Sequence, residues 1–71
     1  MQNLILKKYD NIIIEFLNGF KKISYNIQEN ETLPTLKFMR YFIDAGYKNV
    51  SILINNKLIG KIREGLIFLP D

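Results

Sequence analysis

A chain of 71 residues that contains no cysteine and no histidine has to hold its fold together by packing alone. Chains this short bury only about 60% of the surface that their unfolded state exposes, so many are reinforced by disulfides, a metal or oligomerisation. Disulfides need cysteine, and zinc sites are built mainly from cysteine and histidine. Apolar residues nevertheless make up 48% of the sequence. We therefore expect no metal or cofactor, and a single domain over residues 1–71 that is supported by self-association or by a larger partner.

The first third of the chain predicts a three-stranded antiparallel meander. Apolar side chains recur at every second position, at Leu4 and Leu6 and then within segments 12–16 and 23–27, which is the period of strands. A short loop with Asn11 in the left-handed conformation would place the first strand against the second. Leu4 and Leu6 would then lie on the buried face of the sheet.

Asn18-Gly19 is the strongest turn signal in the sequence. A type I′ turn needs a positive φ at both central residues, and asparagine and glycine adopt such angles readily. This turn would join the second strand to the third and place Glu15 opposite Lys22.

One helix is expected over residues 33–45. Thr32 is a suitable N-cap, Pro34 is tolerated in a first helical turn, and Gly46 suits the position that follows a helix. The charged residues of this segment fall on one narrow stripe. Apolar residues cover the rest, about twice the arc that a surface helix normally buries.

The last third predicts a fourth strand at residues 50–54, a fifth at 58–62 and a short sixth at 66–69. Gly60, inside the fifth strand, indicates a bulge or a close approach of the helix. The order βββ-α-ββ(β) is that of a small α+β domain with one helix packed on an antiparallel sheet. A small curled β-barrel with one helix is the alternative.

The sequence offers no constellation of catalytic residues. General acid–base catalysis uses histidine most often, and its absence leaves only scattered carboxylates and lysines. The four glycines are spread along the chain in turn and cap positions, so there is no glycine-rich phosphate-binding loop. We expect a protein that is not an enzyme, with no catalytic, cofactor-binding or metal-binding residues.

The excess of apolar residues indicates a contact surface. Ile12-Ile13-Ile14 is apolar on both faces of its strand, so a one-residue change of register exchanges the faces without removing the excess. Exposed apolar patches larger than a few hundred Å² usually mark interfaces. The residues expected at a protein interface are Leu17, Phe20, Phe38, Tyr41, Ile59, Leu66 and Phe68.

A nucleic-acid-binding module is the alternative function. Basic and aromatic side chains that share the outer face of a sheet can bind phosphates and stack bases. The basic residues expected there are Lys7, Lys22, Lys61 and Arg63. The net charge of +3 is modest, and outward lysines often serve only to keep strand edges soluble, so protein binding is favoured. Capture of a small ligand at an oligomer interface is a third interpretation.

We interpret the sequence as that of a small regulator or inhibitor that forms a homo-oligomer and binds a protein partner. Residues 1–4 lack the basic segment and apolar run of a signal peptide, and no apolar stretch approaches the ~18 residues that a membrane span needs. We therefore expect a cytoplasmic location and no membrane association. The abundance of isoleucine, asparagine and lysine is typical of AT-rich coding sequences and suggests a low-GC bacterium, or a phage or plasmid of one.

Overall fold

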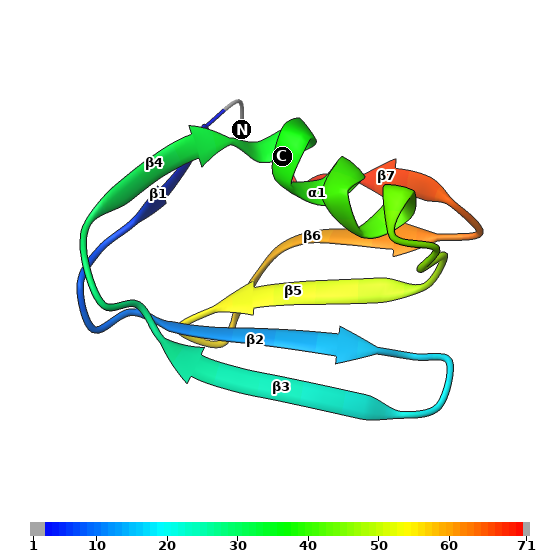
Figure 1. The fold of residues 1–71 in the computed structure, drawn as a ribbon, viewed down its shortest axis with the longest axis horizontal. Coiled ribbons are helices and arrows are strands. Elements are labelled where there is room, and N and C mark those ends of the chain that lie inside the picture. Colours follow the sequence, from blue (N-terminus) through cyan, green and yellow to red (C-terminus); the bar gives the residue numbers. More distant parts are fainter. Residues whose placement is uncertain (1–2, 71) are drawn as a thin grey trace.

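Seven strands and one helix follow one another along residues 3–70, the part of the chain that the computed structural model describes (Figure 1). The predicted α+β class is confirmed, and the described strands form no closed barrel. The strands are β1 (Asn3–Leu6), β2 (Asn11–Phe16), β3 (Lys21–Asn26), β4 (Glu31–Pro34), β5 (Val50–Ile54), β6 (Lys57–Arg63) and β7 (Leu66–Phe68), and the helix α1 spans Thr35–Asp44.

The strands form two antiparallel sheets. The larger sheet has the order β3-β2-β5-β6-β7, and β1 pairs with β4 in a separate two-stranded ribbon. In Figure 1 the ribbon lies across one end of the larger sheet, α1 lies near β6 and β7, and the β2–β3 hairpin lies at the far side. We call the sheet face that is turned toward α1 the inner face, and the opposite face the outer face.

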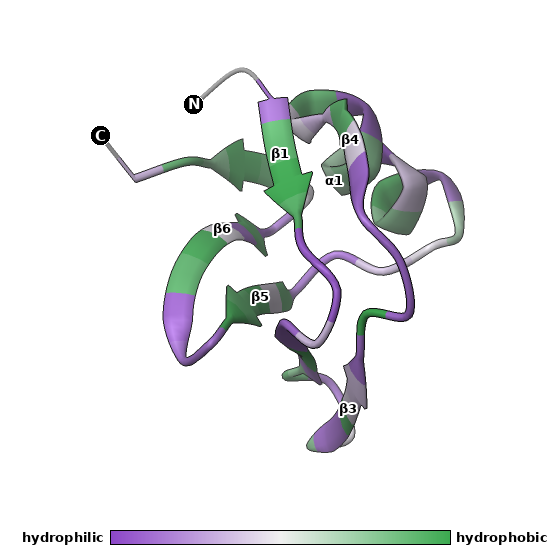
Figure 2. Cartoon of the chain, turned by 90° about the vertical axis from the view of Figure 1, so that its left-hand side faces the viewer, coloured by the Kyte–Doolittle hydropathy of each residue, from purple (hydrophilic) through white to green (hydrophobic). Residues whose placement is uncertain are grey.

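The hydrophobic core lies between the inner face, α1 and the ribbon. Alternate strand residues point into it, as the period of two predicts, and Leu4 and Leu6 are buried as expected. Figure 2 shows β1 and β5 as predominantly apolar elements. The buried apolar residues are Leu4, Leu6, Ile12, Ile14, Phe16, Ile27, Met39, Val50, Ile52, Ile59 and Ile62.

The prediction that β1 pairs with β2 is wrong. The amide of Asp10 donates to the carbonyl of Lys7 over 2.9 Å, and Tyr9, rather than Asn11, takes a left-handed φ of 77°. The Tyr9 amide donates to the carbonyl of Ile27, and the Ile27 amide donates to the carbonyl of Asp10. Tyr9 and Asp10 therefore both lie opposite Ile27, which is a β-bulge that bends the chain. Beyond this bulge β1 leaves the larger sheet and pairs with β4.

The helix begins at Thr35 rather than at Leu33. A residue that precedes proline is pushed out of the helical region into an extended conformation, and Leu33 precedes Pro34. Leu33 accordingly belongs to β4, and Pro34, with φ −64° and ψ 128°, takes the N-cap position that was predicted for Thr32.

The helix ends at Asp44, one residue before the predicted end, and Gly46 follows its C-cap as predicted. Gly46 has a φ of +96°, its amide donates to the carbonyl of Ile43, and the amide of Tyr47 donates to the carbonyl of Phe42. These two bonds form a Schellman motif, which glycine favours because it has no Cβ. Among residues 3–70, no helix has the length and apolar content needed to cross a membrane.

The β2–β3 hairpin has the predicted register, with Glu15 opposite Lys22. Its turn differs from the prediction, because the positive φ angles lie at Gly19 (94°) and Phe20 (54°) and not at Asn18. Four residues, 17–20, therefore form the loop, instead of a two-residue type I′ turn.

A bulge at Ile59 divides β6. Ile52 faces Gly60 and Leu53 faces Leu58, so Ile59 is the extra residue in the ladder. The bulge turns Ile59 inward, where it is 5% exposed, and the predicted exposure of Ile59 at an interface is therefore wrong. The close approach expected at Gly60 is present, since a Cβ there would lie 3.0 Å from the methyl group of a methionine in α1.

Candidate protein-binding groove

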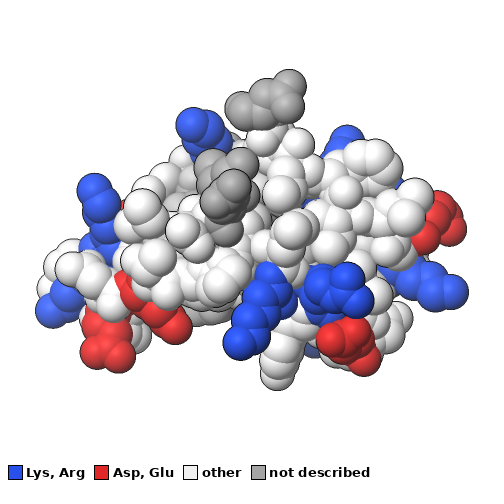
Figure 3. Space-filling model, turned by 90° about the horizontal axis from the view of Figure 1, so that it is seen from above, with Lys and Arg blue, Asp and Glu red and all other residues white. Residues whose placement is uncertain are grey.

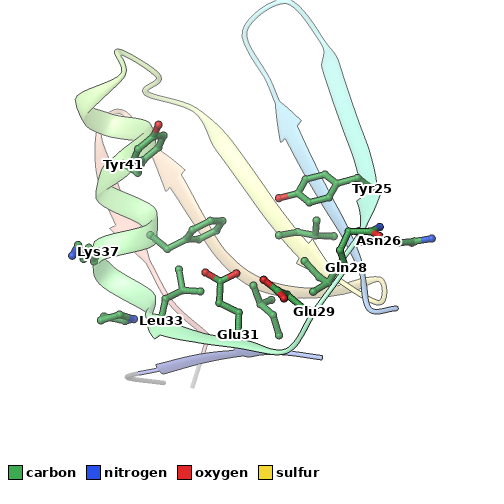
Figure 4. Close-up of a pocket in the computed structure, with 13 residues that line it drawn as sticks. Tyr25, Asn26, Gln28, Glu29, Glu31, Leu33, Lys37 and Tyr41 are labelled. Atoms are coloured by element: carbon green, nitrogen blue, oxygen red, sulfur yellow. The ribbon is translucent and has the colours of Figure 1, made fainter. Parts of the chain in front are cut away.

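A groove opens on the inner face between α1 and β3 (Figure 4), with a volume of about 620 Å³. Its floor is apolar and is built from four segments in the first half of the chain. Leu6 comes from β1, Ile12 from β2, Ile27 from the segment that follows β3, and Leu33 from β4. Leu6, Ile12 and Ile27 are buried and Leu33 is partly buried, so the floor is the margin of the hydrophobic core.

Aromatic side chains form the two walls of the groove. Figure 4 shows Tyr25 on β3 and Tyr41 on α1 at opposite sides, and they are 48% and 74% exposed. Phe38 is half-buried below Tyr41 and packs edge-on against Phe42, with the ring centroids 5.4 Å apart. Phe42 is in turn 6.2 Å from the buried ring of Phe16. This chain of rings anchors the helical wall to the sheet and keeps the groove in shape.

One end of the groove is acidic. Glu29 and Glu31 are exposed, and Figure 4 shows both carboxylates turned toward the cavity. The loop that carries Glu29 is anchored, because the side-chain oxygen of Asn30 accepts a 2.8 Å hydrogen bond from the amide of Lys8. The two carboxylates are thus held in one region and can attract a basic group at this end.

Asp10 stabilises the turn between β1 and β2. Its carboxylate accepts hydrogen bonds from the amide of Lys7 (2.9 Å) and from the side-chain nitrogen of Asn55 (3.0 Å). These bonds favour the charged form and lower the pKa of Asp10, the Lys7 amide having the largest effect. The Asn55 side chain also accepts a bond from the amide of Asn11. Asp10 therefore links the β1–β2 turn to the β5–β6 turn and has a structural role.

The residues predicted for a protein interface do not form one surface. Only Phe38 and Tyr41 line the groove. The prediction missed Tyr25, Glu29 and Glu31. The predicted residues lie at the tip of the β2–β3 hairpin (Leu17, Phe20), in the groove (Phe38, Tyr41), on the outer face of β7 (Leu66, Phe68) and in the core (Ile59).

The basic residues of the nucleic-acid alternative are also dispersed. Lys22 and Lys61 share the outer face, but Glu15 lies between them in the ladder. Arg63 donates to two backbone carbonyls and to a serine hydroxyl at 2.8–3.1 Å, so its guanidinium is already engaged. Lys7 lies in the turn after β1, outside the larger sheet. Seen from above in Figure 3, basic and acidic side chains are interspersed around the edge of the molecule.

Comparison with protein-family models, with curated proteins and with solved structures gives no match for this chain. In the part of the chain that the structure describes, no three acidic side chains gather closely enough to hold a metal ion. The groove is therefore interpreted from its geometry and chemistry alone.

Proposed function

We propose that this protein is a small cytoplasmic protein-interaction module, without enzymatic activity, that self-associates and regulates or inhibits a protein partner bound in the groove. The observation that carries the proposal is the uncovered inner side of β3, the strand at the edge of the larger sheet. Ile23 and Tyr25 point to the same side as the core, yet they are 37% and 48% exposed.

The dimensions of the elements explain why the inner side of β3 is open. Strands lie about 4.8 Å apart, so a five-stranded sheet is roughly 24 Å wide. One helix is about 10 Å in diameter and covers about two strands. Since α1 packs against β4 and β6, the inner residues of β2 are still buried, but those of β3 lack a covering layer. A second helix beside α1 would complete the usual arrangement of helices on one face of a sheet.

The partner segment that fits this site is an amphipathic helix. Its apolar stripe would lie on Leu33 and Phe38 between the rings of Tyr25 and Tyr41, as helices bind in apolar grooves. A lysine or arginine near one end of the helix would lie at the acidic end of the groove. Catalysis is not part of the proposal, because the polar side chains that line the groove include no paired nucleophile and base.

Selection from a displayed library of amphipathic helical peptides tests the proposal. The wild-type protein should enrich peptides with apolar residues at helical spacing and a basic residue near one end. Tyr25→Ser/Tyr41→Ser should lose these peptides, while folding is kept because both side chains are largely exposed. Tyr9→Ser, which also removes an exposed tyrosine but lies outside the groove lining, is the matched control and should bind as the wild type does. Failure to enrich any helix, or binding that the double variant leaves unchanged, would exclude the groove as the binding site.

A further inference from the structure

The β3 strand has a free edge. It pairs with β2 and with no other strand among the described residues, and all six of its residues are exposed. At the opposite edge of the sheet, β7 has only three residues. An unpaired edge strand presents a row of amides and carbonyls that another strand can bind. The edge of β3 is thus the longer of the two edges at which the sheet could be extended.

The ladder shows which backbone groups of β3 point toward the open edge. The amide of Ile27 donates to the carbonyl of Asp10 over 2.8 Å, so Ile27 directs its backbone groups toward β2. In an antiparallel ladder this direction alternates from one residue to the next. Lys22, Ser24 and Asn26 therefore direct their amides and carbonyls away from β2, toward the open edge. Of these groups the carbonyl of Asn26 accepts a 3.2 Å hydrogen bond from the side chain of Gln28, an exposed contact that strand pairing would replace.

We propose that a second copy of this chain binds this edge through its own β3, antiparallel and with the two-fold axis at Ser24. Ser24 then pairs with Ser24 of the second copy, and Lys22 pairs with Asn26. Every outward group of the strand has a counterpart in this register, and the two sheets become one continuous sheet. The inference rests on the self-association in the proposed function and names the surface that carries it.

The same register brings exposed apolar side chains together. Ile23 of one copy lies opposite Tyr25 of the other, and this pair occurs twice because of the two-fold axis. Both side chains are on the inner face and partly exposed in the single chain. Ile23 and Tyr25 would form a non-hydrogen-bonded pair, in which the two side chains lie especially close. An aromatic residue opposite a β-branched residue is a favourable cross-strand combination.

Charge supports the antiparallel direction. Lys21 lies at the hairpin end of β3, opposite the buried Phe16 and therefore on the inner side, whereas Glu29 follows the other end. Antiparallel pairing places Lys21 of each copy at the end of the strand where Glu29 of the other copy lies. Lysines on an edge usually prevent strand pairing, but in this register Lys22 faces Asn26 and not another lysine. The dimer contact shares Tyr25 and Glu29 with the groove, whereas Tyr41 and the rest of α1 lie outside the dimer contact.

The first test compares Ser24→Pro with Ser24→Ala by light scattering over a range of concentrations. Both variants lose the 3.1 Å hydrogen bond from Asn11 to the serine hydroxyl, but only proline removes the outward amide. Proline is tolerated on a free strand edge, and circular dichroism would verify the fold. We expect Ser24→Pro to raise the dimer dissociation constant by roughly tenfold or more, because two symmetry-related donors are lost. Ser24→Ala should remain dimeric.

The second test uses charge reversal and does not depend on proline. Lys21→Glu and Glu29→Lys should each weaken self-association, because each creates two like-charge contacts. A mixture of the two variants should form a heterodimer, in which both contacts are again between opposite charges. Lys57→Glu, at an exposed position on β6, is the control and should have no effect.

The outcomes separate this inference from the proposed function. A monomeric wild type that still binds helical peptides in the groove would overturn the β3 pairing and leave the binding function intact. A dimer that is insensitive to both Ser24→Pro and the charge reversals would place the contact on another face and also overturn the inference. A dimer with the expected sensitivities that binds no peptide would support the β3 pairing and exclude the groove as a binding site.

Discussion

Phe20 occupies a position that costs the single chain stability. Its φ of 54° lies in the left-handed region, which costs a residue other than glycine about 1–2 kcal/mol. Its side chain is 92% exposed and so makes little compensating contact within the chain. Such strain is maintained where a residue serves a function, and in the proposed dimer Phe20 lies beyond the paired edge, next to Gln28 of the second copy. Phe20→Gly should therefore stabilise the monomer.

The size of the effect follows from three contributions. Relief of the left-handed conformation gains about 1–2 kcal/mol. A fully buried phenylalanine is worth about 1.5–3 kcal/mol, so a side chain that is 92% exposed forfeits roughly 0.2 kcal/mol. The freedom of glycine in the unfolded chain costs about 0.5–1 kcal/mol. The net gain is about 0.5 kcal/mol, which corresponds to a rise in Tm of about 2–4 °C for a domain of this size.

Thermal unfolding at a concentration where the protein is monomeric measures this gain. Tyr9→Gly is the matched control, since Tyr9 is also aromatic, 75% exposed and left-handed with a φ of 77°. It should give a similar rise, lessened by the loss of a contact between its ring and the ammonium of Lys8 at 5.1 Å. A lower Tm for Phe20→Gly would refute the reasoning, because it would mean that Phe20 makes a stabilising contact within the monomer.

Three further substitutions test the core and the turn network. Gly60→Ala should lower the free energy of unfolding by about 1 kcal/mol in a urea titration, because the new methyl group would lie 3.0 Å from a methionine of α1 that has to shift; an unchanged midpoint would contradict this. Thr35→Val should raise the free energy of unfolding by about 1 kcal/mol, because Thr35 is fully buried and its hydroxyl has no hydrogen-bond partner among the described residues. A loss of stability would indicate that the hydroxyl does have a hydrogen-bond partner. Hydrogen bonds from the amide of Lys7 and then from Asn55 hold the pKa of Asp10 below its ordinary 3.8. The carboxylate therefore stabilises the fold above pH 3.8, and this stabilisation is lost as the pH falls through the folded-state pKa. Asp10→Asn should therefore be less stable than the wild type at neutral pH, and the two unfolding curves should converge well below pH 3.8.

Local features were predictable from the sequence because they depend on a few neighbouring residues. Gly46 ends the helix since its φ of +96° favours glycine, and the register of Glu15 opposite Lys22 follows from a hairpin between adjacent strands. The partner of β1 was not predictable in this way. The alternation at Leu4 and Leu6 identified a buried face correctly, but it does not specify which strand the segment pairs with. A left-handed Tyr9 redirects that strand, and tyrosine seldom signals such a conformation.

The groove was harder to predict than the fold because it arises from what the helix leaves uncovered. Tyr25 was assigned to the buried side of its strand, and its direction is correct, yet α1 does not extend over it. Ile59 shows the opposite error. Gly60 indicated a bulge or a close approach of the helix, but not that Ile59 is the extra residue, which the bulge turns into the core. The excess of apolar residues on the predicted helix and strands did indicate surplus contact area, and Phe38 and Tyr41 do line the groove.

The native mass of the wild-type protein, measured by light scattering as a function of concentration, tests most directly whether this chain acts by contact with itself. A dimer of two 8.4 kDa chains is expected at high concentration, dissociating on dilution. A mass of 8.4 kDa at every concentration would contradict self-association.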